Sequence, residues 1–212
     1  MKKKKVYLIF KRIIDFSLSL VAIILLSPLF LLISIIIKVE SRGPVFFKQK
    51  RVGKNKKYFN IYKFRTMKSD TPKDMPTHLL ENAESYITKV GGFLRKSSLD
   101  ELPQIINILK GEMSIVGPRP ALWNQDDLIK EREKYGANDI LPGLTGLAQI
   151  SGRDELEITV KAKLDGEYTK KCSLILDMKI FLKTIINVFK HEGIVEGKIE
   201  KKDEKNINYG EK

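Results

Sequence analysis

The chain has 212 residues and a formal net charge of +13, from 39 Lys and Arg against 26 Asp and Glu. This length can bury a real core, and a hydrophobic content of 42% excludes a wholly disordered chain. The single cysteine excludes an internal disulfide framework, and with two histidines a Cys- or His-rich metal centre is not expected. The positive surplus points to a polyanionic partner: nucleic acid, an anionic membrane or a phosphorylated substrate.

The first element along the chain is an apolar segment, residues 16–37, which contains no charged residue. As an α-helix it would be roughly 33 Å long, enough to cross a bilayer. It is too long for the apolar part of a signal peptide. Ser27 and Pro28 lie at its middle, where proline predicts a kink and the serine hydroxyl can bind a freed carbonyl. Both flanks are basic, which favours a helix that enters the membrane and returns to the same face; a kinked span is the alternative.

Next, residues 44–67 predict a basic β-hairpin with a turn at residues 53–55. This hairpin is either a surface for anionic lipid headgroups or a phosphate site, in which Lys63 and Arg65 bind the phosphate. Four helices are then predicted, at residues 79–90 with an end at Gly91-Gly92, at 102–110 with an end at Gly111, at about 124–135 and at 155–171.

Residues 173–190 predict a strongly amphipathic helix, with apolar residues on one face and lysines on the other. It is either a core helix or a helix at the membrane interface. The charged tail, residues 192–212, is expected to be disordered. The expected organisation is a membrane helix in residues 1–40, a compact domain in 41–191 and this tail. The expected fold is a small, mostly helical α/β structure with a short hairpin and amphipathic interfacial helices.

The most informative polar residues are Asp100 and Glu101, which directly precede a short helix. One interpretation is a capping box, in which Ser98 and Glu101 satisfy the first amides of that helix. However, Pro103 favours a helix that begins at residue 102 or 103, which would leave both acids in the preceding turn. Paired carboxylates suit phosphate chemistry: one can attack phosphorus or hold Mg²⁺, and the other can tune it.

Arginines in short Pro- or Gly-rich stretches are candidates to neutralise that phosphate: Arg95, Arg119 between Pro118 and Pro120, and Arg153. Individually, such arginines are more often surface charges. The chain lacks the glycine-rich loops of the usual nucleotide-binding folds.

Five motifs, in order, give the chain a resemblance to a known family. They are KRIIDF leading into the Ser27-Pro28 segment, YKFRTM, SLDELPQ with KGEMSIVGPRP, PGLTGLAQISGRD, and LDMKI. Together they resemble the bacterial sugar transferases of the monotopic phosphoglycosyl transferase superfamily. The length is similar to that of the minimal members, whereas larger members carry an additional N-terminal multi-span domain.

The resemblance implies transfer of a sugar-1-phosphate from a UDP-sugar to undecaprenyl phosphate, with UMP as the second product. Asp100 would form the covalent intermediate and contact Mg²⁺, and Glu101 would complete the dyad. Ser27 and Pro28 would break the membrane helix. The substrate-binding positions would be Lys63, Arg65, Arg95, Pro118, Arg119, Pro120, Gln149, Arg153 and Asp177.

The same resemblance implies a monotopic protein on the cytoplasmic face of the inner membrane, at the first membrane step of exopolysaccharide, O-antigen or capsule synthesis. Downstream glycosyltransferases and a second copy of the chain are expected partners, and nucleic acid is not. The main alternative is a non-catalytic, membrane-anchored basic protein that binds anionic lipid or nucleic acid, with salt-sensitive binding. A relative that has lost catalysis is a further alternative. The sequence does not identify the sugar.

Overall fold

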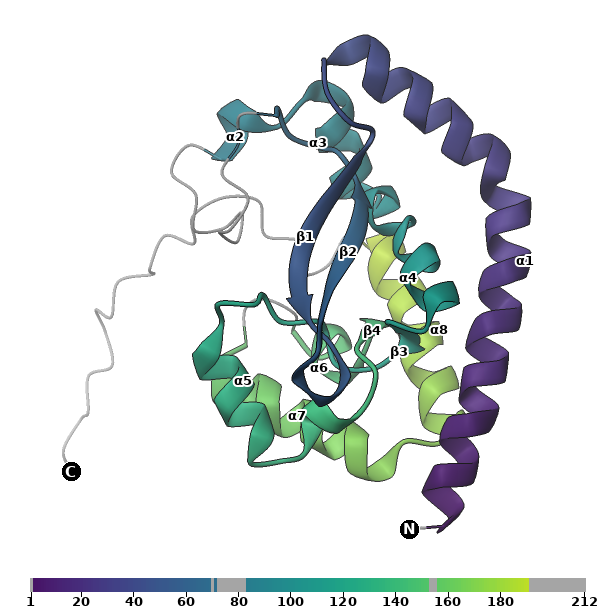
Figure 1. Ribbon diagram of the computed structural model, residues 1–212, viewed down its shortest axis with the longest axis vertical. Coiled ribbons are helices and arrows are strands. Elements are labelled where there is room, and N and C mark those ends of the chain that lie inside the picture. Colours follow the sequence, from purple (N-terminus) through teal and green to yellow (C-terminus); the bar gives the residue numbers. More distant parts are fainter. Residues whose placement is uncertain (1, 70, 72–82, 153–155, 191–212) are drawn as a thin grey trace, which may run out of the picture.

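The structure is a computed structural model that describes residues 2–69, 71, 83–152 and 156–190. It is mostly helical with two small sheets (Figure 1). Its elements in chain order are α1 (Lys2–Glu40), β1 (Phe46–Val52), β2 (Tyr58–Phe64), α2 (Ala83–Tyr86), α3 (Lys89–Lys96), α4 (Gln104–Lys110), β3 (Ser114–Val116), α5 (Asp126–Glu133), β4 (Gly143–Thr145), α6 (Leu147–Ile150), α7 (Ile158–Lys171) and α8 (Leu174–Lys190). The expected tail at residues 192–212 lies outside the described residues.

Helix α1 is continuous through Pro28, but it bends in its C-terminal half (Figure 1). Proline cannot donate a hydrogen bond to the carbonyl four residues earlier, which is that of Ile24. The Ser27 hydroxyl donates to this carbonyl instead, at 2.8 Å. The predicted hydrogen bond from the Ser27 hydroxyl to the freed carbonyl is therefore confirmed, and this acceptor is satisfied within the helix.

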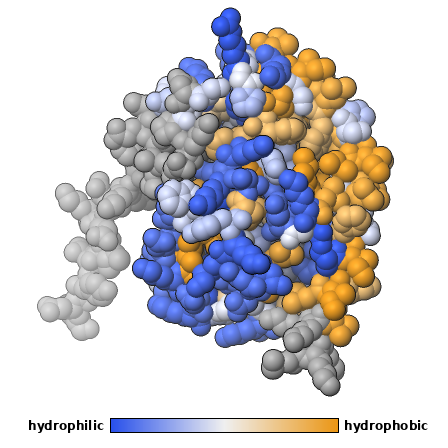
Figure 2. Space-filling view, in the orientation of Figure 1, coloured by the Kyte–Doolittle hydropathy of each residue, from blue (hydrophilic) through white to orange (hydrophobic). Residues whose placement is uncertain are grey.

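The two faces of α1 have opposite surroundings. One face packs against α3, α4 and β3, and its buried residues are Lys11, Asp15, Ser19, Ile33 and Ile37. The other face is exposed and apolar, and Figure 2 shows it as a hydrophobic surface along one side of the molecule. This exposed face comprises Val6, Ile9, Phe10, Ile13, Phe16, Leu20, Val21, Ile24, Leu25, Leu31, Leu32, Ile35, Ile36 and Val39.

The hairpin predicted at residues 44–67 is confirmed. Strands β1 and β2 pair antiparallel, from Phe46 opposite Phe64 to Val52 opposite Tyr58. Phe64 is buried with Ile37 of α1 and Leu94 of α3. This cluster fixes the C-terminal half of α1 against the hairpin and so places Lys63, the neighbour of Phe64, beside the turn that follows α3.

A parallel pair of three-residue strands, β3 and β4, was not expected. Ser114 lies opposite Gly143, and Val116 lies opposite Thr145. The close approach of the two backbones requires glycine at position 143, because a Cβ on Gly143 would lie 2.1 Å from the Gly117 amide nitrogen. The pairing brings the Pro118–Pro120 turn against the loop that leads to α6.

The prediction that Gly91-Gly92 ends a helix is wrong. Helix α3 begins at Lys89 and passes through both glycines. Its N-cap is Thr88, whose hydroxyl accepts a hydrogen bond from the Gly91 amide at 2.9 Å. Glycine is needed here for packing, since a Cβ on Gly91 would lie 2.0 Å from the Thr66 carbonyl oxygen. The predicted helices α4, α5, α7 and α8 are present.

Helix α8 turns its apolar face outward, so the core-helix interpretation is wrong for that face. Asp177 and Ile180 are buried against the domain. The exposed apolar residues of α8 are Leu174, Ile175, Met178, Phe181, Leu182, Ile185 and Ile186.

Candidate functional site

Asp100 and Glu101 lie on a short 3-10 turn, Leu99–Glu101, between α3 and α4. Helix α4 begins at Gln104, after Pro103. Ser98 has a φ of 56° and makes no side-chain capping hydrogen bond. The capping-box interpretation is therefore wrong, and the alternative, in which both acids stand ahead of the helix, is confirmed.

Glu101 lies between two cations from different parts of the chain. The Lys63 ammonium, from β2, donates to its Oε1 at 2.6 Å. The Arg119 guanidinium donates to the same oxygen at 3.2 Å. Arg119 stands between two buried prolines, so the direction of its backbone is fixed. The hairpin, the turn before α4 and the turn after β3 thus converge on one carboxylate.

Asp100 is the buried member of the pair, with 8% of its surface exposed. Burial raises the pKa of Asp100, and the adjacent Glu101 charge adds to the rise, while Lys63, Arg95 and Arg119 oppose it. The Lys63 nitrogen lies 3.7 Å from Asp100 Oδ2, compared with 2.6 Å from Glu101. Asp100 is therefore the poorly solvated and more weakly paired carboxylate, which suits a nucleophile.

Three side chains around this turn have buried polar atoms with no hydrogen-bond partner among the residues that the structure describes. They are Nη1 of Arg95, Nε2 of Gln104 and both amide atoms of Gln149. Buried polar atoms are normally paired, so the three nitrogen donors fit a site completed by an acceptor-rich ligand, and Gln149 Oε1 would need a donor from it. Arg95 lies in the last turn of α3, and Gln104 begins α4 four residues after Asp100. Sequence reasoning did not single out Gln104; its position directly after the dyad and Pro103 was the available signal.

Gln149 belongs to the same region through the Pro118–Pro120 turn. A Cβ on Gly146 would lie 2.1 Å from the Gly117 carbonyl oxygen and 2.6 Å from Gln149 Oε1. The unpaired Gln149 amide therefore lies beside the start of the turn that carries Arg119.

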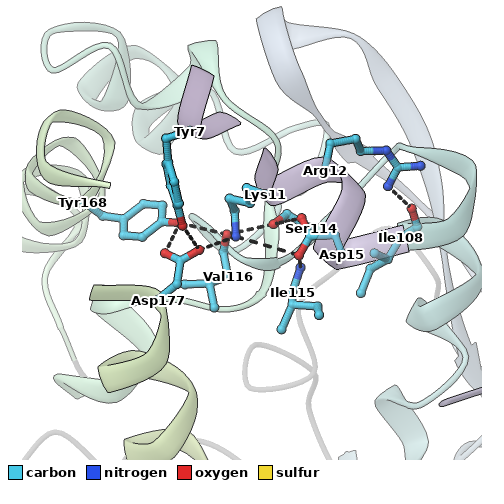
Figure 3. Close-up of polar contacts among 10 residues, drawn as sticks. All are labelled: Tyr7, Lys11, Arg12, Asp15, Ile108, Ser114, Ile115, Val116, Tyr168 and Asp177. Carbon is cyan, nitrogen blue, oxygen red and sulfur yellow. Dashed lines mark hydrogen bonds and ion pairs between the residues drawn. The ribbon is translucent and has the colours of Figure 1, made fainter. Parts of the chain in front are cut away.

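Two predicted site residues lie elsewhere. The Arg65 guanidinium donates to the carbonyls of Ile37, Ser41 and Arg42, at the C-terminal end of α1. Asp177 contacts Tyr7, Lys11 and Tyr168 (Figure 3). Arg65 thus contacts the C-terminal end of α1 and the residues after it, and Asp177 contacts α1 and α7; neither forms a hydrogen bond or ion pair with Asp100 or Glu101 among the described residues. Arg153 lies outside the described residues.

The donor set near Asp100 fits Mg²⁺ only as a site shared with substrate. Within the described ranges, no group of three or more His, Cys, Asp or Glu side chains could hold a metal. Glu101 is already bound by Lys63 and Arg119, which leaves Asp100 as the carboxylate available to a cation. Mg²⁺ is commonly bound through one or two carboxylates with substrate phosphates completing the shell.

Comparison with known proteins identifies the family of the chain. The family model described as bacterial sugar transferase matches residues 6–191. The chain therefore belongs to the bacterial sugar transferase family.

Relatives within this family are similar over most of the chain. Exopolysaccharide production protein ExoY of Sinorhizobium fredii is 38% identical, with 82% of this chain and 83% of that protein covered. The UDP-glucose:undecaprenyl-phosphate glucose-1-phosphate transferase of Escherichia coli is 40% identical, over 84% of this chain and 40% of that protein. The UDP-N-acetylgalactosamine-undecaprenyl-phosphate N-acetylgalactosaminephosphotransferase of Aeromonas hydrophila is also 40% identical, over 85% of this chain and 44% of that protein. The two transferases are thus matched over less than half of their lengths.

Proposed function

We propose that this protein transfers a sugar-1-phosphate from a UDP-sugar to undecaprenyl phosphate, at the first membrane step of exopolysaccharide or related glycan synthesis. The observation that carries the proposal is the buried Asp100 beside a Glu101 held by Lys63 and Arg119. The named activities of the relatives supply the reaction class.

In the first step, an Asp100 oxygen attacks the phosphorus that carries the sugar. The phosphoanhydride bond breaks, and UMP leaves with the bonding electron pair. In the second step, a phosphate oxygen of the acceptor attacks the same phosphorus, and the bond to Asp100 breaks. This sequence releases undecaprenyl-diphosphate sugar and restores the carboxylate. Dividing the transfer in this way means that two large anionic substrates need not be in the site together.

The surrounding residues bind and orient the phosphates. Arg95 and Gln104 offer buried donors without partners among the described residues, and Lys63 and Arg119 supply positive charge. Glu101 fixes these two cations at one place. Mg²⁺, held by Asp100 and the phosphates, would neutralise charge on the diphosphate. The Gln149 amide, beside the Pro118–Pro120 turn, would bind the nucleotide part of the donor.

We also propose that the protein is monotopic, with its catalytic domain on the cytoplasmic face of the membrane. Both ends of α1 are bound to the same domain, through Lys11 at one end and through the carbonyls held by Arg65 at the other. A span would have to place one of these ends, with its part of the polar domain, across the bilayer. The outward apolar faces of α1 and α8 suit a helix that enters the membrane and a second helix that lies at its surface.

The test is UMP release by detergent-solubilised protein with Mg²⁺, undecaprenyl phosphate and a panel of UDP-sugars. Asp100→Asn should lower release more than about a hundred-fold. The matched control is Asp126→Asn, because Asp126 is exposed on α5. A donor with a labelled sugar, given without acceptor, should label the wild-type chain and not the Asp100 variant. Release that survives in Asp100→Asn would contradict the proposal.

A further inference from the structure

Four polar residues in the first turns of α1 contact the elements that carry the site. We call Tyr7, Lys11, Arg12 and Asp15 the docking cluster (Figure 3). Lys11, Arg12 and Asp15 belong to the KRIIDF motif, to which the proposed reaction gives no role. Asp15 is 2% exposed and Lys11 is 8% exposed. Charges this deeply buried are costly unless they are paired, so each contact of the cluster constrains geometry.

The first contact joins α1 to α8. The Lys11 ammonium and the Tyr7 hydroxyl both donate to Oδ2 of Asp177. The Tyr168 hydroxyl donates to Oδ1 of Asp177 at 2.7 Å and also lies 3.1 Å from the Val116 carbonyl oxygen. Burial raises the pKa of Tyr168, so its phenol stays protonated. Asp177 thus links α1, α7 and α8 at the end of β3.

The second contact holds strand β3 directly. Asp15 accepts hydrogen bonds from the Ser114 hydroxyl at 2.7 Å and from the Ile115 amide at 3.2 Å. Strand β3 pairs with β4 through Ser114 and Val116, so the Ile115 amide faces the opposite edge. The Asp15 carboxylate therefore accepts the hydrogen bond that the carbonyl of a neighbouring strand would accept at this edge of β3. Four residues beyond Ile115, the same chain presents Arg119 to Glu101.

The third contact holds helix α4. The Arg12 guanidinium donates to the carbonyls of Ile108, at 2.6 Å, and Leu109, at 2.9 Å. These carbonyls lie at the negative end of α4, where a cation is favourable. Helix α4 begins just after Asp100 and Glu101, and β3 leads to Arg119. The cluster therefore contacts both chain segments that carry the site.

We propose that the docking cluster positions the site. It holds β3 and α4 in a fixed relative position, so that Arg119 contacts Glu101 only when α1 is packed against both elements, which we call the seated state of α1. Lys11, Arg12 and Asp15 are positioning residues that act through Arg119 and the dyad, without contact with substrate. This proposal rests on the proposed function, and it makes catalysis depend on the seating of the membrane helix.

The kinetic test is a double-mutant cycle between Asp15→Asn and Arg119→Ala. In the wild-type background, Asp15→Asn should lower kcat/KM for the UDP-sugar about ten-fold. In the Arg119→Ala background, the same change should lower it less than about two-fold, because the group through which Asp15 acts is already gone. A merely structural role predicts that the two losses multiply, and that result would overturn the proposal.

The second test measures whether α1 is packed against the domain, and it does not depend on enzymatic activity. Cys172, the single cysteine, packs against the Tyr168 core cluster. Lys11→Met should increase the rate at which a maleimide modifies Cys172, whereas Lys38→Met, the matched change on an exposed part of α1, should not. Resistance of the protein to carbonate extraction from membranes should be unchanged in both variants.

The outcomes separate the two proposals. If the wild-type protein releases no UMP but the Lys11 variant exposes Cys172, the docking contact stands and the proposed reaction fails. If the wild-type protein is active while Lys11→Met leaves both Cys172 modification and kcat/KM unchanged, the positioning proposal is overturned. Should Asp15→Asn prove unstable, Arg12→Lys enters the same cycle with Arg119→Ala, because it keeps the charge and loses the two-carbonyl contact.

Discussion

Lys63 bridges two carboxylates unequally, and this has a consequence for the pH dependence of activity. Its charge lowers the pKa of Asp100, which burial raises. In the proposed mechanism, Asp100 has to be ionised to attack phosphorus, so activity should fall as the pH drops through its raised pKa. Lys63→Met removes a lowering influence, and the pKa of Asp100 should rise further. The acid limb of the kcat/KM profile should then move to higher pH.

This shift is measured from initial rates of UMP release between pH 4 and 9. Lys57→Met is the matched control, because Lys57 is exposed at the end of the hairpin turn. An acid limb that stays in place in the Lys63 variant would mean that Asp100 does not limit the rate at low pH.

Arg65 gives a second residue-level prediction. Its guanidinium donates to the Ser41 carbonyl and also to the Ile37 carbonyl, which accepts a second hydrogen bond from the Ser41 amide. Arg65→Met should lower the free energy of unfolding by roughly 1–3 kcal/mol. The KM for the UDP-sugar in the remaining folded protein should not change. Thermal unfolding in detergent, together with donor titration, checks both. A raised KM at unchanged stability would instead make Arg65 a substrate ligand.

At the scale of elements, the adjacent glycines of α3 form a matched pair. A Cβ on Gly91 would lie 2.0 Å from the Thr66 carbonyl oxygen, whereas a Cβ on Gly92 would have its nearest contact at 3.9 Å. Gly91→Ala should therefore destabilise the protein by roughly 1–3 kcal/mol through overpacking. Gly92→Ala should stabilise it by up to about 1 kcal/mol, since alanine favours helix. Denaturant unfolding of the two variants measures the difference, and equal effects would contradict the packing of α3 on Thr66.

The elements that were predicted correctly carry strong local signals. The hairpin has its turn residues, α4 ends at a glycine with a φ of 81°, and α8 has a clear helical period. The pair β3–β4 could not be predicted, because three residues establish no periodicity and the pairing depends on two glycine backbones in contact. Gly91-Gly92 was wrongly predicted to end a helix for a similar reason. The close contact with Thr66 joins separate parts of the chain and leaves no signal in the local sequence.

The site shows the same limit. The acids ahead of Pro103 correctly indicated a turn before α4, and Lys63 and Arg119, which were predicted for the same site, form ion pairs with Glu101 in it. Arg65 and Asp177 were assigned from motifs, but their partners in α1, Ile37 and Lys11, lie 28 and 166 residues away along the chain. A sequence pattern indicates that a charge needs a partner, whereas only the fold decides which partner it meets.

At the scale of the whole molecule, the proposed monotopic arrangement makes a prediction about sidedness. In a Cys172→Ser background, Ile9→Cys and Val39→Cys each place a thiol at an exposed position near one end of α1. A membrane-impermeant maleimide should modify both in inverted membrane vesicles and neither in intact spheroplasts. Modification of one from each side would establish a span and contradict the re-entrant arrangement.

The contact between Lys11 and Asp177 also fixes an order of events during synthesis. The two residues are 166 positions apart, so α1 leaves the ribosome long before α7 and α8 exist. Throughout that interval, the apolar helix has neither Asp177 nor the rest of its domain to cover its polar face. In the proposed monotopic arrangement, α1 can therefore enter lipid before the domain closes, and its contact with Asp177 forms only after α8 has been synthesised. Truncated chains that end before α8 should reach the membrane, but α1 should not be packed against the domain in them.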